Sequence, residues 1–345
     1  MNFSNQVKAL LQQDIESMAT LRHLFVAHPD SDMTRNRKIN FQSALSFILS
    51  MEKDTMDMEL LKFYGLSKKI PTPSAFYQQR QKLKTELFPY LLNLFNSHFP
   101  PKLYGDILPI ACDGSEFNIF LDPGNPDTYF EPNGKSNRGF NLIHVTALYD
   151  ILNRQYLDAV IQPGKKKNEY KAICEMADQF QCKKQYKPLF IADRGFGSYN
   201  FYAHAIRNGI FFLVRVKDLN ALRLLGAEDF QSGDIDISLE RILTRSHSKK
   251  KCLQPDKGNE YRCLEANVNF DFLPVGSLGE YTLRLRFVRF QIADGAYENL
   301  VTNLPENHSL DNLKTFYHLR WNIETSFSHL KHAISATSFH SKKYK

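Results

Sequence analysis

The stretch KPLFIADRGFGSYNFYAHAIRNGIFFLVRV, residues 187–216, decides the fold class. Its first seven residues form a short apolar run that predicts a buried strand ending on Asp193. Residues 199–208 predict a helix, and residues 210–216 predict a second buried strand. A strand, a helix and a strand in succession are typical of a sheet covered by helices, so the predicted fold class is α/β.

The preceding segments extend this pattern. Three strands are predicted over residues 107–113, 140–150 and 155–163, and a helix fits residues 168–179. The full order is therefore three strands, helix, strand, helix, strand. Residues 1–104 carry apolar residues at helical spacing instead, which predicts a separate helical region.

The segments that follow have a different pattern of residue types. Residues 218–303 alternate β-branched and aromatic residues with Gly, Pro and Asp turns, which predicts a β-rich insertion. One helix over about residues 310–334 is then predicted to close the chain. The predicted organisation has four regions, namely an N-terminal helical region, the first part of the core, the insertion, and a segment that completes the core: 1–104, 105–217, 218–303 and 304–345.

Composition narrows the class of protein. The 345 residues are 43% hydrophobic and 23% charged, as in ordinary globular proteins. No run approaches the ~18 apolar residues of a membrane span, and no signal peptide is recognisable at the N-terminus. Five scattered cysteines without a C-x-x-C pair predict reduced thiols in a cytoplasmic protein, with neither disulfides nor a zinc site.

Positive charge is concentrated in particular segments. The net charge is +7, and residues 60–85 contain six basic residues and no acidic one: Lys62, Lys68, Lys69, Arg80, Lys82 and Lys84. This segment predicts a helix capped by Asp54, a turn, and a basic helix beginning at Thr72-Pro73 and running through AFYQQRQKLK. The outline fits a helix-turn-helix DNA reader and equally an ordinary helical bundle. Arg80 and Lys82 are the candidate DNA contacts, whereas the lysine triplets at 165–167 and 249–251 are also typical of solvated loops.

Two aspartates follow buried strands. Asp113 ends ILPIACD, and Asp193 ends KPLFIAD. In open α/β sheets, ligands gather at the carboxyl ends of strands. One such Asp often only caps a turn, but a pair beside a third carboxylate favours a functional site.

The third carboxylate lies in FYHLRWNIETSFSHLK, residues 316–331. At about 100° per residue, the apolar side chains form one arc of roughly 80°. An adjoining arc of roughly 60° contains Tyr317, Arg320, Glu324 and Lys331. These side chains border the buried face, so we expect them to be partly desolvated unless the alignment arises by chance.

Three converging carboxylates suit two hard divalent cations with oxygen ligands. Two such ions about 4 Å apart support phosphoryl transfer. Arg, Lys and Tyr beside a carboxylate can hold phosphate oxygens. Together with the basic segments, this favours a nucleic-acid substrate.

The motifs together resemble a known family. The pattern Y-x2-R-x3-E-x6-K on the last helix, ACDGS, IADRGFGSYN, and the segments FLVRVK, LVTNLP and RWNIE are similar to those of DDE transposases of bacterial insertion sequences, the IS-four group. KKNE at 166–169 and the β-rich insertion also match. The resemblance covers about residues 65–341 and implies an RNase H-like core with an N-terminal helical DNA-binding region.

The resemblance also implies chemistry and partners. Asp113, Asp193 and Glu324 would form the catalytic metal-binding triad for two Mg²⁺ ions, with Mn²⁺ as a substitute. Side chains of Tyr317, Arg320 and Lys331 would contact transposon-end DNA near the cleaved phosphate. The expected partners are double-stranded DNA, as element ends and target, and a second copy of the chain. The expected location is the bacterial cytoplasm at the nucleoid. Trp321 points off the Glu324 face, so no residue is assigned to hold a flipped base.

One departure from the family leaves an alternative open. Family members usually continue past the FHSKK-like segment, whereas this chain ends at Lys345, 21 residues after Glu324. The alternative function is a truncated, non-catalytic DNA-binding derivative, a relic or an inhibitor. A cellular RNase H-like nuclease is disfavoured by the Tyr-Arg-Glu-Lys helix. Three histidines on that helix share no face and are expected at the surface: His318, His329 and His332.

Overall fold

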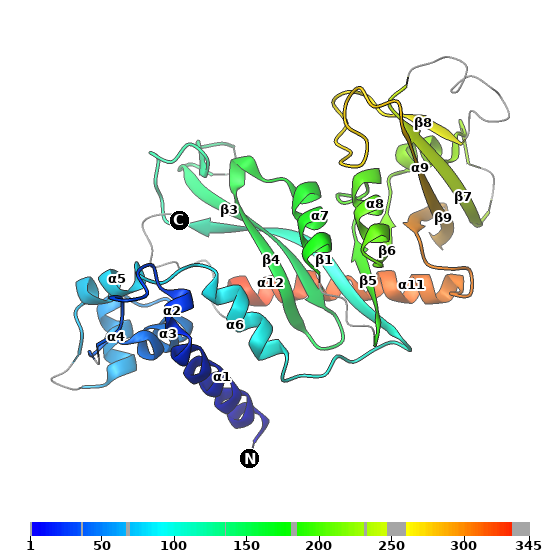
Figure 1. Cartoon of the computed structure of the whole chain (residues 1–345). Coiled ribbons are helices and arrows are strands. Elements are labelled where there is room, and N and C mark those ends of the chain that lie inside the picture. The colour runs from blue at the N-terminus through cyan, green and yellow to red at the C-terminus, as the bar shows by residue number, and fades with distance from the viewer. Residues whose placement is uncertain are drawn as a thin grey trace.

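The computed structural model describes residues 2–35, 37–66, 70–134, 136–180, 185–230, 233–246 and 260–332. Helices dominate the first hundred residues, and a ten-stranded sheet with helices on both faces forms the rest (Figure 1). This arrangement confirms the α/β fold class.

The N-terminal region is a bundle of six helices packed around its own apolar cluster, which includes Met18, Leu45, Phe47 and Phe76. The helices are α1 (Phe3–Thr20), α2 (Arg22–Phe25), α3 (Phe41–Ser50), α4 (Met56–Tyr64), α5 (Pro73–Arg80) and α6 (Leu87–Asn96). The bundle meets the sheet through α6, where Asn96 donates a hydrogen bond to the carbonyl of Tyr156 at 2.8 Å.

Two local expectations for this bundle are wrong. The cap of α4 is Thr55, whose hydroxyl accepts from the Met58 N–H, because Asp54 pairs with Lys62 at 2.5 Å instead. Helix α5 begins at the predicted Thr72 cap but ends at Arg80, before Lys82. It ends there because the following backbone pairs with the segment after α2, through a bridge between Leu83 and Val26.

The core sheet has the strand order expected of an RNase H-like fold. Its strands are β1 (Ile107–Ile119), β2 (Tyr129–Phe130), β3 (Phe140–Asp150), β4 (Gln155–Pro163), β5 (Lys187–Ala192) and β6 (Phe211–Arg215). β3 pairs antiparallel with β1 and β4 with β3, whereas β5 runs parallel to β1 and β6 parallel to β5. The spatial order β4-β3-β1-β5-β6 follows, and the parallel steps are crossed by helices α7 (Glu169–Gln179) and α8 (Tyr199–Arg207).

The predicted insertion extends this sheet. It contains β7 (Ile235–Thr244), β8 (Tyr261–Cys263), β9 (Glu280–Ala293) and β10 (Ala296–Thr302). β10 pairs antiparallel with β6, so the added strands continue the core at its edge. The segment opens with an unpredicted helix, α9 (Asp218–Leu225), which ends on Gly226 in the left-handed conformation.

The last helix is divided, although a single helix was predicted. α11 (Leu310–Leu319) and α12 (Trp321–His332) lie end to end behind the sheet (Figure 1). The Arg320 N–H bonds to the Tyr317 carbonyl three residues back, and Arg320 keeps helical dihedral angles, so the axis continues. The expected core residues Phe316, Ile323 and Phe327 are buried, and Ile334 lies outside the described residues.

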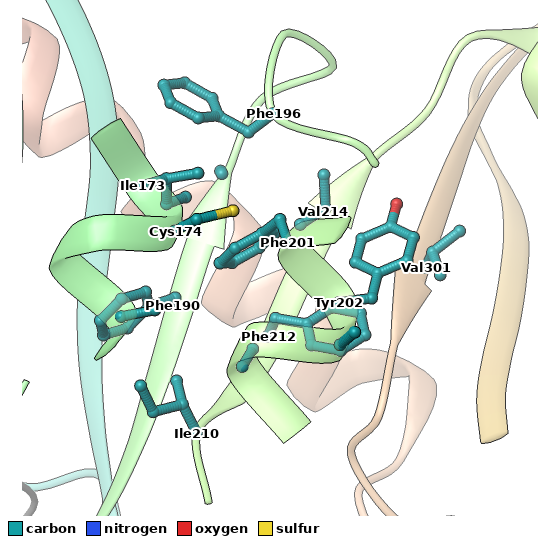
Figure 2. Close-up of a cluster of buried hydrophobic side chains, with 14 of the residues drawn as sticks. Ile173, Cys174, Phe190, Phe196, Phe201, Tyr202, Ile210, Phe212, Val214 and Val301 are labelled. Atoms are coloured by element: carbon teal, nitrogen blue, oxygen red, sulfur yellow. The ribbon is translucent and has the colours of Figure 1, made fainter. Parts of the chain in front are cut away.

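Alternation along the strands divides the core into two faces. Even-numbered residues of β1, β5 and β6 point toward α7 and α8, where aromatic rings fill the space (Figure 2). Odd-numbered residues point toward α11 and α12. We call these the aromatic face and the helix-pair face.

Candidate active site

Asp113 and Asp193 lie side by side where the pairing between β1 and β5 ends. Asp193 directly follows β5, as predicted, whereas the prediction that the first strand ends on Asp113 is wrong, because pairing with β3 continues β1 to Ile119. The parallel register pairs Cys112 of β1 with Ala192 of β5, and each aspartate is the next residue. Ala111 and Ile191, two residues before each aspartate, belong to the helix-pair face. Strand alternation therefore directs both carboxylates toward α11 and α12.

Asp113 is in electrostatic contact with several charged groups. Burial raises the pKa of its carboxyl to about 6, and the Gly114 N–H, which donates to Oδ1 at 2.8 Å, works in the opposite direction. The Arg320 guanidinium also lowers this pKa, while Glu324 and Glu169 raise it. The Asp113 carboxyl is therefore partly desolvated and is influenced by one cation and two other carboxylates.

The helix pair meets the strand ends through the predicted polar residues. The Tyr317 hydroxyl donates to Asp193 Oδ1 at 3.1 Å, and Arg320 donates to Glu324 Oε1 at 2.9 Å. Lys331 donates to the Ser115 hydroxyl at 2.7 Å, beside Asp113. The predicted triad and its three neighbours are therefore brought together.

Tyr317 and Arg320 are more deeply buried than expected, at 4% and 2% exposure, whereas the Glu324 side chain is 40% exposed. Burial raises the pKa of the Tyr317 phenol far above its usual value, so the phenol stays a hydrogen-bond donor. Arg320 stacks near the rings of Tyr317 and Trp321, at 5.5 and 5.0 Å. Its buried Nε has no hydrogen-bond partner among the described residues.

The donor set suits a hard cation, but the carboxylates are not gathered as a ligand cage. Within the described ranges, no group of three His, Cys, Asp or Glu side chains lies close enough to hold a metal ion. Two of the three carboxylates are instead engaged by Tyr317 and Arg320. Divalent cations nevertheless favour carboxylate oxygens as ligands. Asp113 offers such oxygens in a partly desolvated position, where two other carboxylates raise its pKa.

The two N-terminal candidates lie elsewhere. Arg80 ends α5 and lies over the Tyr77 ring at 5.5 Å, while Lys82 pairs with the buried Asp32 at 3.4 Å. Both belong to the helical bundle and not to the carboxylate site. Lys166 and Lys167 pair with Asp127 and Glu116, and several other basic residues lie outside the described residues: Lys68, Lys69, the triplet 249–251 and the terminal SKKYK.

Other side chains that were considered lie apart from the site. Trp321 is 54% exposed, and the three histidines of the helix pair are exposed, as expected. Cys112, Cys174 and Cys263 are not joined in a disulfide within the described residues, and Cys182 and Cys252 fall outside them. No helix in the described part of the chain has the length and apolar character needed to cross a membrane.

The sequence interpretation missed two acidic residues near the triad. Glu298 of β10 pairs with Arg215 at 3.3 Å, and burial raises its pKa, with Asp193 contributing. Glu169, the first residue of α7, lies close enough to raise the pKa of Asp113. The available signal for Glu169 was the KKNE motif, together with the glycines that follow Asp113 and Asp193.

Comparisons with known proteins identify the family of the chain. The chain matches the protein family described as "Transposase DDE domain" over residues 105–345. A solved structure of piggyBac transposase, in a synaptic complex with hairpin DNA, is similar at 11% identity and a TM-score of 0.43. That similarity covers 84% of this chain and 57% of the other, so the chain spans a little over half of that protein's length. No curated protein matches.

Proposed function

The chain belongs to the transposase DDE domain family, and from this premise we propose that it cleaves DNA at the ends of an insertion sequence and joins them to target DNA by cut-and-paste transposition. The observation that carries the proposal is that three carboxylates from separate elements lie on one side of the sheet. Asp113 of β1 and Asp193 after β5 are neighbours, and Glu324 on α12 is near enough to raise the pKa of Asp113. Within the family we assign the chain to the IS-four group, and the Tyr-Arg-Glu-Lys spacing supports this assignment.

In this proposal, Asp113, Asp193 and Glu324 hold two Mg²⁺ ions, for which Mn²⁺ substitutes. Such ions lower the pKa of bound water and stabilise the leaving oxygen during phosphoryl transfer. Glu324 is paired with Arg320 at 2.9 Å, so it must exchange this partner to serve as a ligand. The Arg320 guanidinium is then available to a phosphate oxygen, as its unpartnered Nε also suggests.

The chemical steps follow from the substrate. A water oxygen forms a bond to the scissile phosphorus while the P–O3′ bond breaks, leaving a 3′-hydroxyl and a 5′-phosphate. The 3′-hydroxyl oxygen then attacks a phosphorus of the target strand and displaces its 3′ oxygen. Tyr317, Arg320 and Lys331 surround the carboxylates and are assigned to hold the end phosphates during these steps.

The proposal extends to partners and place. The N-terminal helices, with Arg80 and Lys82, are assigned to double-stranded DNA outside the cleavage site. Two copies of the chain would pair the two element ends, and the protein would act at the nucleoid in the cytoplasm. Hairpin excision and a base-flipping residue are not assigned.

The test is cleavage of a labelled duplex that carries the element's terminal inverted repeat, with Mg²⁺ or Mn²⁺. Wild type is expected to nick at the element end, and Glu324→Gln is expected to reduce the rate by roughly 10³-fold or more, because triad members act as a unit. Glu240→Gln is the matched control, since Glu240 lies on β7 and pairs with Arg284. End binding without cleavage by wild type would overturn the proposal and favour a non-catalytic DNA-binding derivative.

A further inference from the structure

Glu169 lies beside Gly114 of β1, on the aromatic-face side of the sheet. Asn168 caps α7 by accepting from the Lys171 N–H, so Glu169 begins the helix with its side chain toward the sheet. A Cβ at Gly114 would lie 2.4 Å from Glu169 Oε1, and a Cβ at Gly195 would lie 3.6 Å from Oε2. The carboxylate therefore lies between the two glycines that follow Asp113 and Asp193.

At Gly114 the glycine is required by space and not by backbone conformation, whereas a Cβ at Gly195 would make an ordinary contact. Neither Gly114 nor Gly195 has a positive φ, so an L-residue could adopt either backbone geometry. At Gly114 the obstacle is side chains from two other elements, because a Cβ there would also lie 2.5 Å from His144 Nε2. Because Gly114 has no side chain, Glu169 and His144 can approach β1 beside Asp113.

His144 is in close contact with the Glu169 carboxylate, although its Nε2 is not in hydrogen-bonding geometry. It lies on β3 at 2% exposure, and its Nε2 is 2.9 Å from Glu169 Oε1. His144 is also the main cause that lowers the pKa of Glu169, against the effect of burial, and Lys167 adds to it. An ionised carboxylate is therefore held at a fixed point on the aromatic face, opposite Asp113.

The link to the triad runs through Gly114. Its N–H donates to Asp113 Oδ1 at 2.8 Å, so a displacement of Gly114 displaces the Asp113 carboxylate. We propose that Glu169, held by His144, is a positioning residue that sets the placement of Asp113 relative to Asp193 for metal binding, an inference that rests on the proposed function. Residues that orient metal ligands typically change metal affinity or activity by about 10–100-fold when they are removed.

The experiment compares Glu169→Ala and Glu169→Gln in the full chain, with Glu175→Ala on the exposed side of α7 as the matched control. Three quantities are measured: the rate of end cleavage, the Mg²⁺ concentration that gives half the maximal rate, and Mn²⁺ affinity by electron paramagnetic resonance. Glu169→Ala is expected to lose about 10–100-fold in rate and to need more Mg²⁺. Its affinity for labelled end DNA should stay at the wild-type value. Glu169→Gln keeps the size and shape of the side chain beside His144 and Gly114, so it should recover most of the rate.

A second pair of variants tests the steric step. Gly114→Ala is expected to reproduce the Glu169→Ala defect, because its Cβ displaces the carboxylate and the imidazole together. Gly134→Ala is the control, since nothing lies within 4 Å of its Cβ. The proposal would be overturned if Glu169→Ala cleaved at the wild-type rate and reached half of that rate at the wild-type Mg²⁺ concentration.

The other outcomes are also decisive. Glu169→Gln as inactive as Glu324→Gln would overturn a positioning role in favour of a direct ligand. If wild type and Glu175→Ala failed to cleave, the proposed function would fail by itself. The Mn²⁺ affinities would then still test the role of Glu169. The proposal predicts that Glu169→Ala binds Mn²⁺ more weakly than wild type and Glu175→Ala do.

Discussion

The two faces of the core sheet share strands but differ in what they bury. The aromatic face holds rings in tight contact, including Tyr202 and Phe212, which stack at 4.6 Å with an angle of 8° between their planes (Figure 2). The helix-pair face buries polar groups as well, among them the Tyr317 phenol and the Arg320 guanidinium. Residues one apart on a strand therefore serve packing on one side and chemistry on the other.

This comparison explains how a charged site can be held rigidly. Burying an unpaired guanidinium is costly, and Arg320 is stabilised by Glu324 and by two aromatic rings. The strands beneath it are fixed from the opposite side by apolar packing, with the Glu169–His144 pair as a polar contact beside Gly114. Variants on the two faces should accordingly fail in different ways, stability on one and chemistry on the other.

The largest expected effect is on the aromatic face. Phe212→Ala removes a fully buried ring and should lower the free energy of unfolding by about 3–5 kcal/mol. The measurement is denaturant unfolding followed by circular dichroism. Phe3→Ala, at a residue that is 68% exposed, should change it by less than about 0.5 kcal/mol. Equal stability of the two variants would break the distinction between the faces.

An intermediate effect is expected at Asp113, with a defined dependence on pH. Its folded-state pKa is about 6 against 3.8 for an ordinary Asp, so the native state binds more protons than the unfolded state between these values. Without divalent ions, the contribution of Asp113 to wild-type stability should therefore fall as pH rises from about 4 to 6, by about 1–3 kcal/mol.

Asp113→Asn removes this titration. The variant should be more stable than wild type at pH 8 in a chelator, and equally stable near pH 4, when melting temperatures are compared across that range. A difference in stability between wild type and Asp113→Asn that stays constant over this pH window would show that Asp113 is not desolvated as described.

The smallest effect is expected for Tyr317→Phe. It removes the donor to Asp193 while keeping the ring, so the loss should be about 1 kcal/mol of stability and about tenfold in cleavage rate. The matched control is Tyr104→Phe, because Tyr104 packs on Phe316 through its ring. Wild-type cleavage by Tyr317→Phe would limit the role of this phenol to packing.

Much of the fold follows from local sequence signals. β3 and β4 begin and end at the predicted residues, because turn residues separate two apolar runs. The triad residues could be selected from the sequence because apolar strand runs and helical spacing are both local patterns. The site roles themselves stay predictions until cleavage is measured.

What the sequence did not reveal depends on tertiary contacts. The cap of α4 moved to Thr55 because Lys62 takes up Asp54, and the helix pair divides at Arg320, where that side chain is buried against Glu324. The role of Glu169 depends on space left by a glycine on another element. The periodicity of apolar residues carries no information about a contact between elements that are distant in the sequence.

The central claim is that Asp113, Asp193 and Glu324 form one cation site on the helix-pair face. The most direct test is Mn²⁺ binding to the protein bound to end DNA, followed by electron paramagnetic resonance in wild type and in Asp113→Asn, Asp193→Asn and Glu324→Gln. The account predicts that each substitution weakens Mn²⁺ binding by at least about tenfold while DNA binding is retained. Equal Mn²⁺ binding by wild type and all three variants would contradict it.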